Sequence, residues 1–205
     1  PLAFFSGAVV LNAGVDFDTY ALRLDGDVTL GTATDTGAQL IIQSGGLISN
    51  GIRTIRSGIQ AGAGASELLL YNNGTTAIGE FANPNTAGLI AASGVTKFGA
   101  GLLQFLGNNA GFTGDIRVQQ GTVELNYRNT ADVATNVVTT IGGNGGNIVF
   151  EGAGTALNLR AGQDGTGVNF TGGAVTFNKG IVLGDYVPTA TISIDRSAGA
   201  AATSQ

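Results

Sequence analysis

The sequence lacks the residues on which most enzyme sites depend. It contains no histidine, cysteine, methionine or tryptophan, and only 3 of its 205 residues are proline. Without histidine and cysteine, the chain cannot build a thiolate zinc site, a histidine-based catalytic triad, a haem ligand pair or a disulfide framework. We therefore expect a protein that is not an enzyme, with no catalytic, cofactor-binding or metal-binding residue and no cofactor.

Charge is scarce as well. Charged residues make up 11% of the chain, and 14 acidic residues outnumber 9 basic ones, which gives a formal net charge of -5. Such a chain has no cationic face that could neutralise a phosphate backbone or anionic lipids, so we expect no nucleic-acid partner. No apolar run reaches the roughly 18 residues of a membrane-spanning helix, so we expect no membrane span.

Glycine and apolar residues are abundant instead. The chain has 35 glycines, far above an average composition, and 43% of its residues are hydrophobic, which is too apolar for a disordered tract. The glycines follow no three-residue period, which excludes a collagen helix. The chain opens at Pro1 with neither methionine nor a basic leader. We expect residues 1–205 to form a single folded segment of a longer chain.

Apolar residues recur in short alternating runs that are closed by glycine, asparagine or aspartate. This pattern predicts strands, and helical spacing is absent. The clearest runs are 20–24, 39–42, 68–71, 116–118, 122–125, 148–150, 156–159 and 191–194. Residues that accept unusual backbone angles separate them at 45–46, 73–74, 107–109, 142–146 and 172–173, which we interpret as corners.

A period of about twenty residues relates several of these runs. The run 96–98 precedes 116–118 by twenty residues, and 103–105 precedes 123–125 by the same step. The same shift places Ile148 on Val168, Phe150 on Phe170, and Leu157 on Phe177. A repeat of this length with two or three short strands predicts a parallel β-helix, in which each strand pairs with its equivalent one turn along. A Greek-key sandwich is the alternative fold, although it has no reason to keep such a phase.

The expected fold class is therefore all-β, a parallel β-helix with rungs of about twenty residues and a length near 50 Å. Its inward columns are expected to contain Phe98, Phe105, Val118, Leu125, Ile148, Phe150, Leu157, Val168, Phe170 and Phe177.

One stretch carries a family resemblance. Residues 94–125 read GVTKFGAGLLQFLGNNAGFTGDIRVQQGTVEL. They resemble the passenger-associated repeat of bacterial autotransporters, roughly L-T-K-x-G-x-G-x-L-x-L-x-G-x-N-x-Y-T-G-x-T-x-V-x-x-G-T-L-x-L, with Phe112 in place of tyrosine and departures at Asp115 and Ile116. The resemblance implies a right-handed parallel β-helix on a secreted or cell-surface protein of a Gram-negative type of bacterium. It implies no single activity, because the repeat is scaffold.

Two patterns raise the possibility of calcium. Asp16 with Asp18 and Asp25 with Asp27 flank the run 20–24, so each pair could offer oxygen ligands on one side, but solvated turn residues are the alternative. The run 142–150 is similar to a calcium-binding β-roll nonapeptide, although Asn147 replaces its essential aspartate and a flexible corner explains the run better. Residues 73–75 and 169–171 match the N-glycosylation sequon, but we interpret them as a turn and a strand and not as modification sites.

The few basic residues have structural interpretations. Lysine occurs only at Lys97 and Lys179. Lys97 belongs to the repeat pattern, where its stem can pack while its ammonium reaches solvent or pairs, so replacement by alanine is expected to cost little. Arg53 and Arg56 are expected to form weak surface pairs with Glu67.

The favoured function is a non-enzymatic structural segment of a surface fibre, stalk or autotransporter passenger, extracellular or on the bacterial cell surface. Its partners would be further copies of itself or neighbouring solenoid repeats, because apolar ends with little charge favour end-to-end assembly into filaments. The alternative is a carbohydrate- or host-binding adhesin passenger that uses exposed Asn, Thr, Gln and Tyr ladders on surface glycans. A degenerate glycan-degrading β-helix is a third hypothesis.

Overall fold

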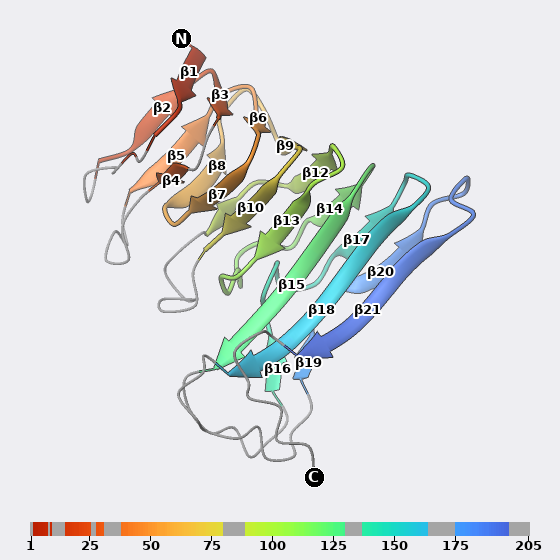
Figure 1. Cartoon of the computed structure of the whole chain (residues 1–205). Helices are drawn as coiled ribbons and strands as arrows, with labels where there is room; N and C mark the ends of the chain where they lie inside the picture. Colours follow the sequence, from red (N-terminus) through yellow and green to blue (C-terminus); the bar gives the residue numbers. More distant parts are fainter. Residues whose placement is uncertain are drawn as a thin grey trace.

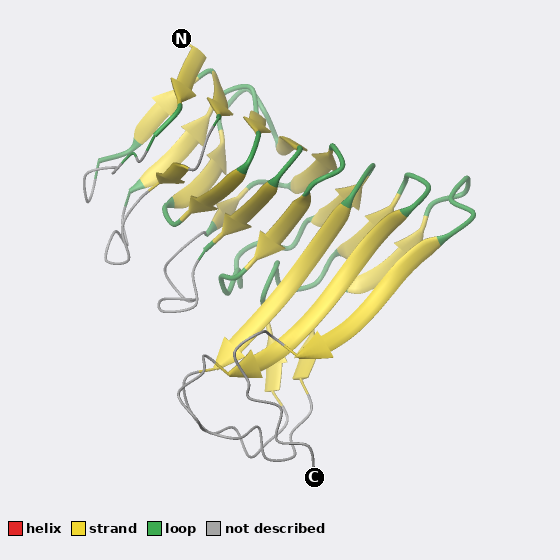
Figure 2. Cartoon of the chain, viewed as in Figure 1, coloured by secondary structure: helices red, strands yellow, loops and turns green. Residues whose placement is uncertain are grey.

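All the secondary structure described in this chain is β. The computed structural model describes residues 2–7, 9, 15–25, 28–30, 38–79, 89–129, 137–163 and 175–196. It shows strands β1 to β21 in three longer sheets and one pair (Figures 1 and 2). No helix in the described ranges is long and apolar enough to cross a membrane.

Each sheet is a stack of parallel strands from different parts of the chain. Sheet A is the stack of β1 (Leu2–Phe5), β3 (Ala21–Leu24), β6 (Gly46–Ser49), β9 (Glu67–Asn72), β12 (Gly94–Phe98), β14 (Asp115–Val118), β17 (Asn147–Phe150) and β20 (Gly180–Leu183). Sheet B is the stack of β4 (Val28–Leu30), β7 (Ile52–Ile55), β10 (Thr75–Ile78), β13 (Leu102–Phe105), β15 (Thr122–Asn129), β18 (Thr155–Gln163) and β21 (Ala190–Arg196). Sheet C contains β2 (Phe17–Thr19), β5 (Gln39–Ile42), β8 (Gly58–Ala61) and β11 (Ile90–Ala91), and β16 (Val137–Thr139) pairs with β19 (Val175–Phe177).

The order of the strands defines a coil. The chain visits sheets A, B and C in turn, as in β3, β4 and β5, and then begins the next rung with β6. Neighbouring rungs pair in parallel, for example β6 with β9 and β13 with β15. This is the arrangement of a β-solenoid, and it overturns the Greek-key alternative, whose strands are antiparallel. The right-handed winding stays a prediction.

The rungs are longer and less regular than the sequence predicted. Successive partners in one inward column of sheet A are Leu22, Leu47, Leu70, Lys97, Val118, Phe150 and Leu183. The shortest step, from Lys97 to Val118, is 21 residues, and the longest, from Phe150 to Leu183, is 33. The expected rung of about twenty residues is therefore wrong, because strands β15 and β18 and the corners between strands differ in length.

Of the two pairings predicted within residues 96–125, one is confirmed and one is wrong in register. The step from Leu103 to Val123 is twenty residues, as predicted. However, Val118 pairs with Lys97 rather than with Phe98, so the repeat in sheet A is offset by one residue. Since side chains alternate across a strand, this offset turns Lys97 inward and Phe98 outward.

The twenty-residue shift also fails in the second half of the chain. Ile148 pairs with Ile181 and Phe150 with Leu183, while the predicted partners Val168 and Phe170 lie outside the described residues. Leu157 pairs with Ile192 rather than with Phe177, which pairs with Thr139. These rungs are more than ten residues longer than the predicted twenty, so each residue pairs farther along the chain than expected. A period found in one part of the sequence cannot reveal that later rungs are longer.

The inward columns form an apolar core. Six of the predicted core residues are buried, namely Phe105, Val118, Leu125, Ile148, Phe150 and Leu157. Phe177 is half-buried and packs against this core. Phe98 is half-buried on the outer face of sheet A, so its predicted inward position is wrong.

The corners between sheets bring backbones very close together. Gly99, which follows β12, has a φ of +79°, and a Cβ there would lie 2.3 Å from the carbonyl oxygen of Asn72 on the rung before. Only glycine accepts both the backbone angle and this approach. The repeat-like stretch thus needs its glycine at this corner for geometric reasons.

Two cations lie inside the core, at the corner between sheets A and B. The Arg53 side chain is fully buried and donates from Nη1 to the Ile52 carbonyl at 2.6 Å and from Nη2 to the Leu24 carbonyl at 3.3 Å. The predicted surface pairing of Arg53 is therefore wrong. Lys97 is also fully buried, and its Nζ lies 2.7 Å from the Gly99 carbonyl and 2.8 Å from that of Gln120. Its stem packs as predicted, but its ammonium stays inside.

Candidate functional site

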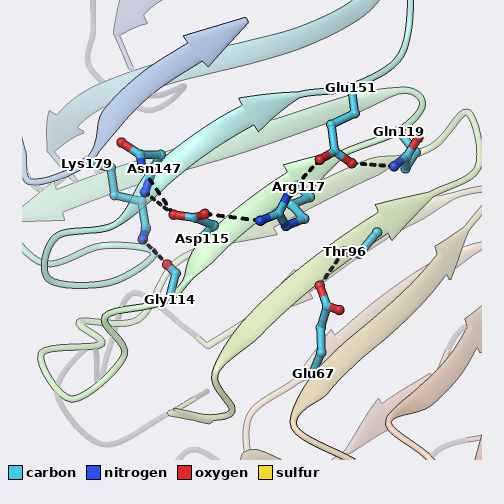
Figure 3. A network of polar contacts seen from close by, with 9 residues as sticks. All are labelled: Glu67, Thr96, Gly114, Asp115, Arg117, Gln119, Asn147, Glu151 and Lys179. Carbon is cyan, nitrogen blue, oxygen red and sulfur yellow. Dashed lines mark hydrogen bonds and ion pairs between the residues drawn. The ribbon is translucent and has the colours of Figure 1, made fainter. Parts of the chain in front are cut away.

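The outer face of sheet A carries a network of exposed and half-exposed polar side chains. Odd-numbered residues of β14 point outward, because Ile116 and Val118 fill the core. Asp115, Arg117 and Gln119 therefore lie on the face that Figure 3 shows, beside Glu151, which follows β17. We call Asp115, Arg117, Gln119, Asn147 and Glu151 the polar network.

Short hydrogen bonds and ion pairs link the members of this network. Arg117 Nη1 lies 2.6 Å from Glu151 Oε1, and Gln119 donates a short hydrogen bond to the other oxygen of Glu151 (Figure 3). Asp115 Oδ1 accepts from the Asn147 backbone N–H at 2.9 Å and from its amide at 3.2 Å. The Glu151 carboxylate raises the pKa of Arg117, so this guanidinium stays charged. The side chains are thereby ordered on the surface of a rigid sheet.

An apolar zone lies next to this network on the same face. Tyr71 is 46% exposed and Leu69 41%, and both point away from the core on β9. The strand pairing places Ile48 and Phe98 on either side of Tyr71. Because Lys97 pairs with Val118, the next residue in each strand also matches, and Gln119 lies beside Phe98 on the following rung. We call Ile48, Leu69, Tyr71 and Phe98 the apolar platform. The sequence analysis missed it, because only the pairing of distant strands brings these residues together.

Lys179 binds backbone carbonyls at the corner that precedes sheet A and does not belong to the polar network on the outer face. Its Nζ donates to the carbonyls of Gly114 at 2.8 Å and Gly145 at 2.7 Å, so it links corners of three successive rungs (Figure 3). The Phe112 ring lies 4.9 Å from the same ammonium. Burial lowers the pKa of Lys179 to about 8, although Asp115 opposes this shift. The glycine-rich run 142–146 is a corner, as predicted, since four of its five residues have positive φ.

The described aspartates near the run 20–24 are used in contacts between rungs. Asp16 accepts from the backbone of Gln39, and Asp18 accepts from the side chain of Gln43. Asp25 pairs with Arg23 at 2.7 Å and accepts from Asn50, and these contacts lower its pKa. Asp27 lies outside the described residues. Within the described ranges no three acidic side chains gather closely enough to hold a metal ion, and calcium binding stays a prediction.

One buried carboxylate deserves comparison with a glycan-cleaving site. Glu124 on β15 is 1% exposed, and its Oε1 accepts from Gln104 and Asn126, both at 2.8 Å. Arg160 Nε lies 3.0 Å from Oε2 as an ion pair, without the alignment of a hydrogen bond. Both oxygens are therefore committed to neighbours on sheet B, which is the arrangement of a structural contact between rungs.

Comparison with known proteins finds one related region. The chain is 30% identical over 167 residues, 78% of its length, to a protein named "Adhesin BmaC autotransporter" from Brucella suis biovar 1 (strain 1330). The matched region spans 4% of the length of that protein. No family model matches the chain, and no solved structure matches it. The sequence similarity thus links this β-solenoid to autotransporters, as the stretch 94–125 predicted, while the type of repeat stays a prediction.

Proposed function

We propose that this chain is a non-enzymatic β-solenoid segment of an autotransporter adhesin passenger, displayed on the bacterial cell surface or outside the cell. The observation that carries the proposal is the 30% sequence identity with an autotransporter adhesin over 78% of the chain, together with a coil of stacked parallel rungs. A rigid coil holds side chains at fixed spacing along an extended face, which suits repeated contact with a large partner.

The repeat-like stretch supports a scaffold role. Lys97 and Gly99 stabilise a corner, and Phe112 is buried in the core, so none of the three lies on an open surface. The described acidic groups Glu124 and Glu151 are likewise paired within the sheets. We infer that residues 94–125 form a passenger-associated repeat whose side chains have structural roles, and that the outer faces make the contact with a partner.

Surface display tests the adhesive function. The 205-residue chain, fused to an outer-membrane anchor on a non-adherent bacterium, is expected to increase attachment to cultured host cells. A strain that displays only the anchor is the control. Attachment no higher than in that strain overturns the adhesive part of the proposal. Release of reducing ends from neutral or acidic polysaccharides by the purified chain overturns the non-enzymatic part.

A structural contribution to a fibre has its own support. Leu183 and Ile194 continue inward columns, yet they are 56% and 82% exposed, because no further described rung covers them. A further solenoid rung, from the same chain or from another copy, is the surface that fits these columns. Sedimentation of the isolated chain tests self-assembly: filaments or concentration-dependent oligomers support it, and a strict monomer at high concentration contradicts it.

A further inference from the structure

The outer face of sheet A is divided into two adjoining zones. Tyr71 and Leu69 of the apolar platform lie on β9, and Phe98 lies beside Tyr71 on β12. The next rungs carry Arg117, Gln119 and then Glu151 of the polar network. Adjacent rungs are about 4.8 Å apart, so the two zones meet within one or two strand spacings. Aromatic and hydrogen-bonding groups therefore follow one another along the axis of the coil.

The polar zone is ordered before any partner arrives. Arg117 is held by Glu151 and lies 3.5 Å from Asp115, while Gln119 is bound to the same Glu151. Each of these planar groups keeps hydrogen-bonding capacity beyond the contacts described, since a guanidinium has five N–H donors and each carboxylate oxygen has two lone pairs. Little side-chain entropy is lost when such groups bind a ligand, which favours even a small contact area.

We propose that this surface, comprising Tyr71, Leu69, Phe98, Arg117, Gln119 and Glu151, is a binding site for a neutral, β-linked glycan chain. The inference rests on the proposed adhesive function and names its ligand. The C–H face of a pyranose ring packs on aromatic and aliphatic side chains. Its neighbouring hydroxyls accept hydrogen bonds from amide and guanidinium N–H groups and donate to carboxylate oxygens. Both kinds of group are present here, in adjoining rungs.

Spacing and charge select the class of glycan. A rung spacing of about 4.8 Å is close to the length of one unit in an extended β-1,4-linked chain, so successive sugars meet successive rungs. The net charge of -5 and the carboxylates of Glu67, Asp115 and Glu151 disfavour sulfated or acidic polysaccharides. A neutral chain lying along the coil axis fits both conditions.

Titration of the purified 205-residue chain tests the site. The probes are the β-1,4-linked tetramers of glucose and of N-acetylglucosamine, with heparin as the anionic comparison, and binding is followed by calorimetry. We expect saturable binding of at least one neutral tetramer. Tyr71→Ala is expected to weaken binding about tenfold, whereas Tyr71→Phe retains the ring and should stay within about twofold of the parent. Gln119→Ala should also weaken it.

Tyr20→Ala is the matched control, because Tyr20 is an exposed tyrosine before β3, in a rung that carries no residue of the proposed site, and its loss should leave binding unchanged. Equal thermal melting of all variants shows that they are folded. The proposal is overturned if neither neutral tetramer binds, if only heparin binds, or if folded Tyr71→Ala binds like the parent.

A second arm separates this inference from the adhesive function. Bacteria that display the chain are tested on host cells before and after enzymatic removal of neutral surface glycans. Attachment that falls after glycan removal supports both proposals. Attachment that persists unchanged leaves the adhesin function standing and overturns the glycan site, and no attachment to untreated cells overturns the adhesin function itself.

Discussion

Single residues at the corners show how this solenoid keeps cations in its interior. Arg53 and Lys97 stand in columns that are otherwise mainly apolar, and each donates N–H groups to backbone carbonyls of two rungs. Corners turn carbonyls inward, where each would remain unsatisfied without a donor. A long cationic side chain supplies several donors to two rungs at once, which explains why Lys97 occupies a core position.

The first prediction concerns Lys97 and pH. Burial lowers its pKa from 10.5 to about 8, so between about pH 8 and 10.5 the unfolded chain binds more protons at this site than the folded chain. The contribution of Lys97 to the free energy of unfolding therefore rises with pH across this window, as a penalty for burying the charge is relieved. Lys97→Met should reduce this rise, measured by urea unfolding at pH 7.5, about 9 and about 10.

Arg23→Met is the control, since Arg23 is an exposed cation that pairs with Asp25 on the surface, and its removal should leave the pH slope unchanged. A Lys97→Met chain with the parent's slope would show that Lys97 titrates normally.

The second prediction concerns the aromatic core. Phe105 and Phe150 are fully buried on sheets B and A. Replacement of either by alanine leaves a cavity between rungs and should lower the free energy of unfolding by about 3 to 5 kcal/mol. Tyr186→Ala, at an exposed site, should change it by no more than about 0.5 kcal/mol. Small losses for both phenylalanines in denaturant titrations would contradict the inward columns.

Among the elements, the corners set how the register of one sheet relates to that of the next. Val95 and Leu103 are eight positions apart, whereas their partners Ile116 and Val123 are seven apart. One residue fewer at the second corner moves the register of sheet A relative to sheet B. The alternation of each strand is unchanged, so the whole strand keeps its inward and outward sets.

The third prediction compares three glycines at such corners. Gly99 has a positive φ and no room for a Cβ, Gly145 has a positive φ with open space, and Gly111 has neither constraint. Substitution by alanine should cost more than about 2 kcal/mol at Gly99, about 1 kcal/mol at Gly145, and nothing at Gly111, where it removes freedom from the unfolded chain. Thermal or urea unfolding measures the order, and equal costs at Gly99 and Gly145 would show that the backbone approach is unimportant.

At the scale of the molecule, the coil is shorter and wider than a regular twenty-residue repeat would make it. Sheet A has eight strands, which at about 4.8 Å per step extend about 34 Å rather than the expected 50 Å. The extra residues lengthen β15 and β18 and the connections instead (Figure 1). Each rung contacts mainly its neighbours, so stability should vary along the axis.

The fourth prediction follows from that variation. Phe150 and Leu183 are partners in one inward column, but Phe150 is fully buried and Leu183 is more than half exposed. Leu183→Ala should therefore cost far less than Phe150→Ala, about 1 kcal/mol or less. Hydrogen exchange should likewise be faster in β20 and β21 than in β12 to β15. Uniform protection in all these strands would contradict a stability gradient.

The sequence by itself determined that the chain is all-β, because alternating apolar runs and glycine corners are local patterns. It also located six buried core residues, from Phe105 to Leu157, since period two fixes which residues of a strand share a face. The sequence also predicted the glycine-containing corners at 45–46, 73–74 and 142–146, which lie between strands or at the start of one in the structure. These features depend only on residues close together in the chain.

Only the tertiary structure decided the register between rungs, and with it the length of each rung, the inward position of Lys97 and the outward position of Phe98. The apolar platform and the polar network on sheet A were likewise invisible in the sequence, because Ile48, Tyr71, Phe98 and Gln119 belong to four different rungs. Pairing depends on how many residues each corner and connection consumes, and no local periodicity records that number. A difference of one residue reverses the face of a strand, so the surface could be read only after the strands were paired.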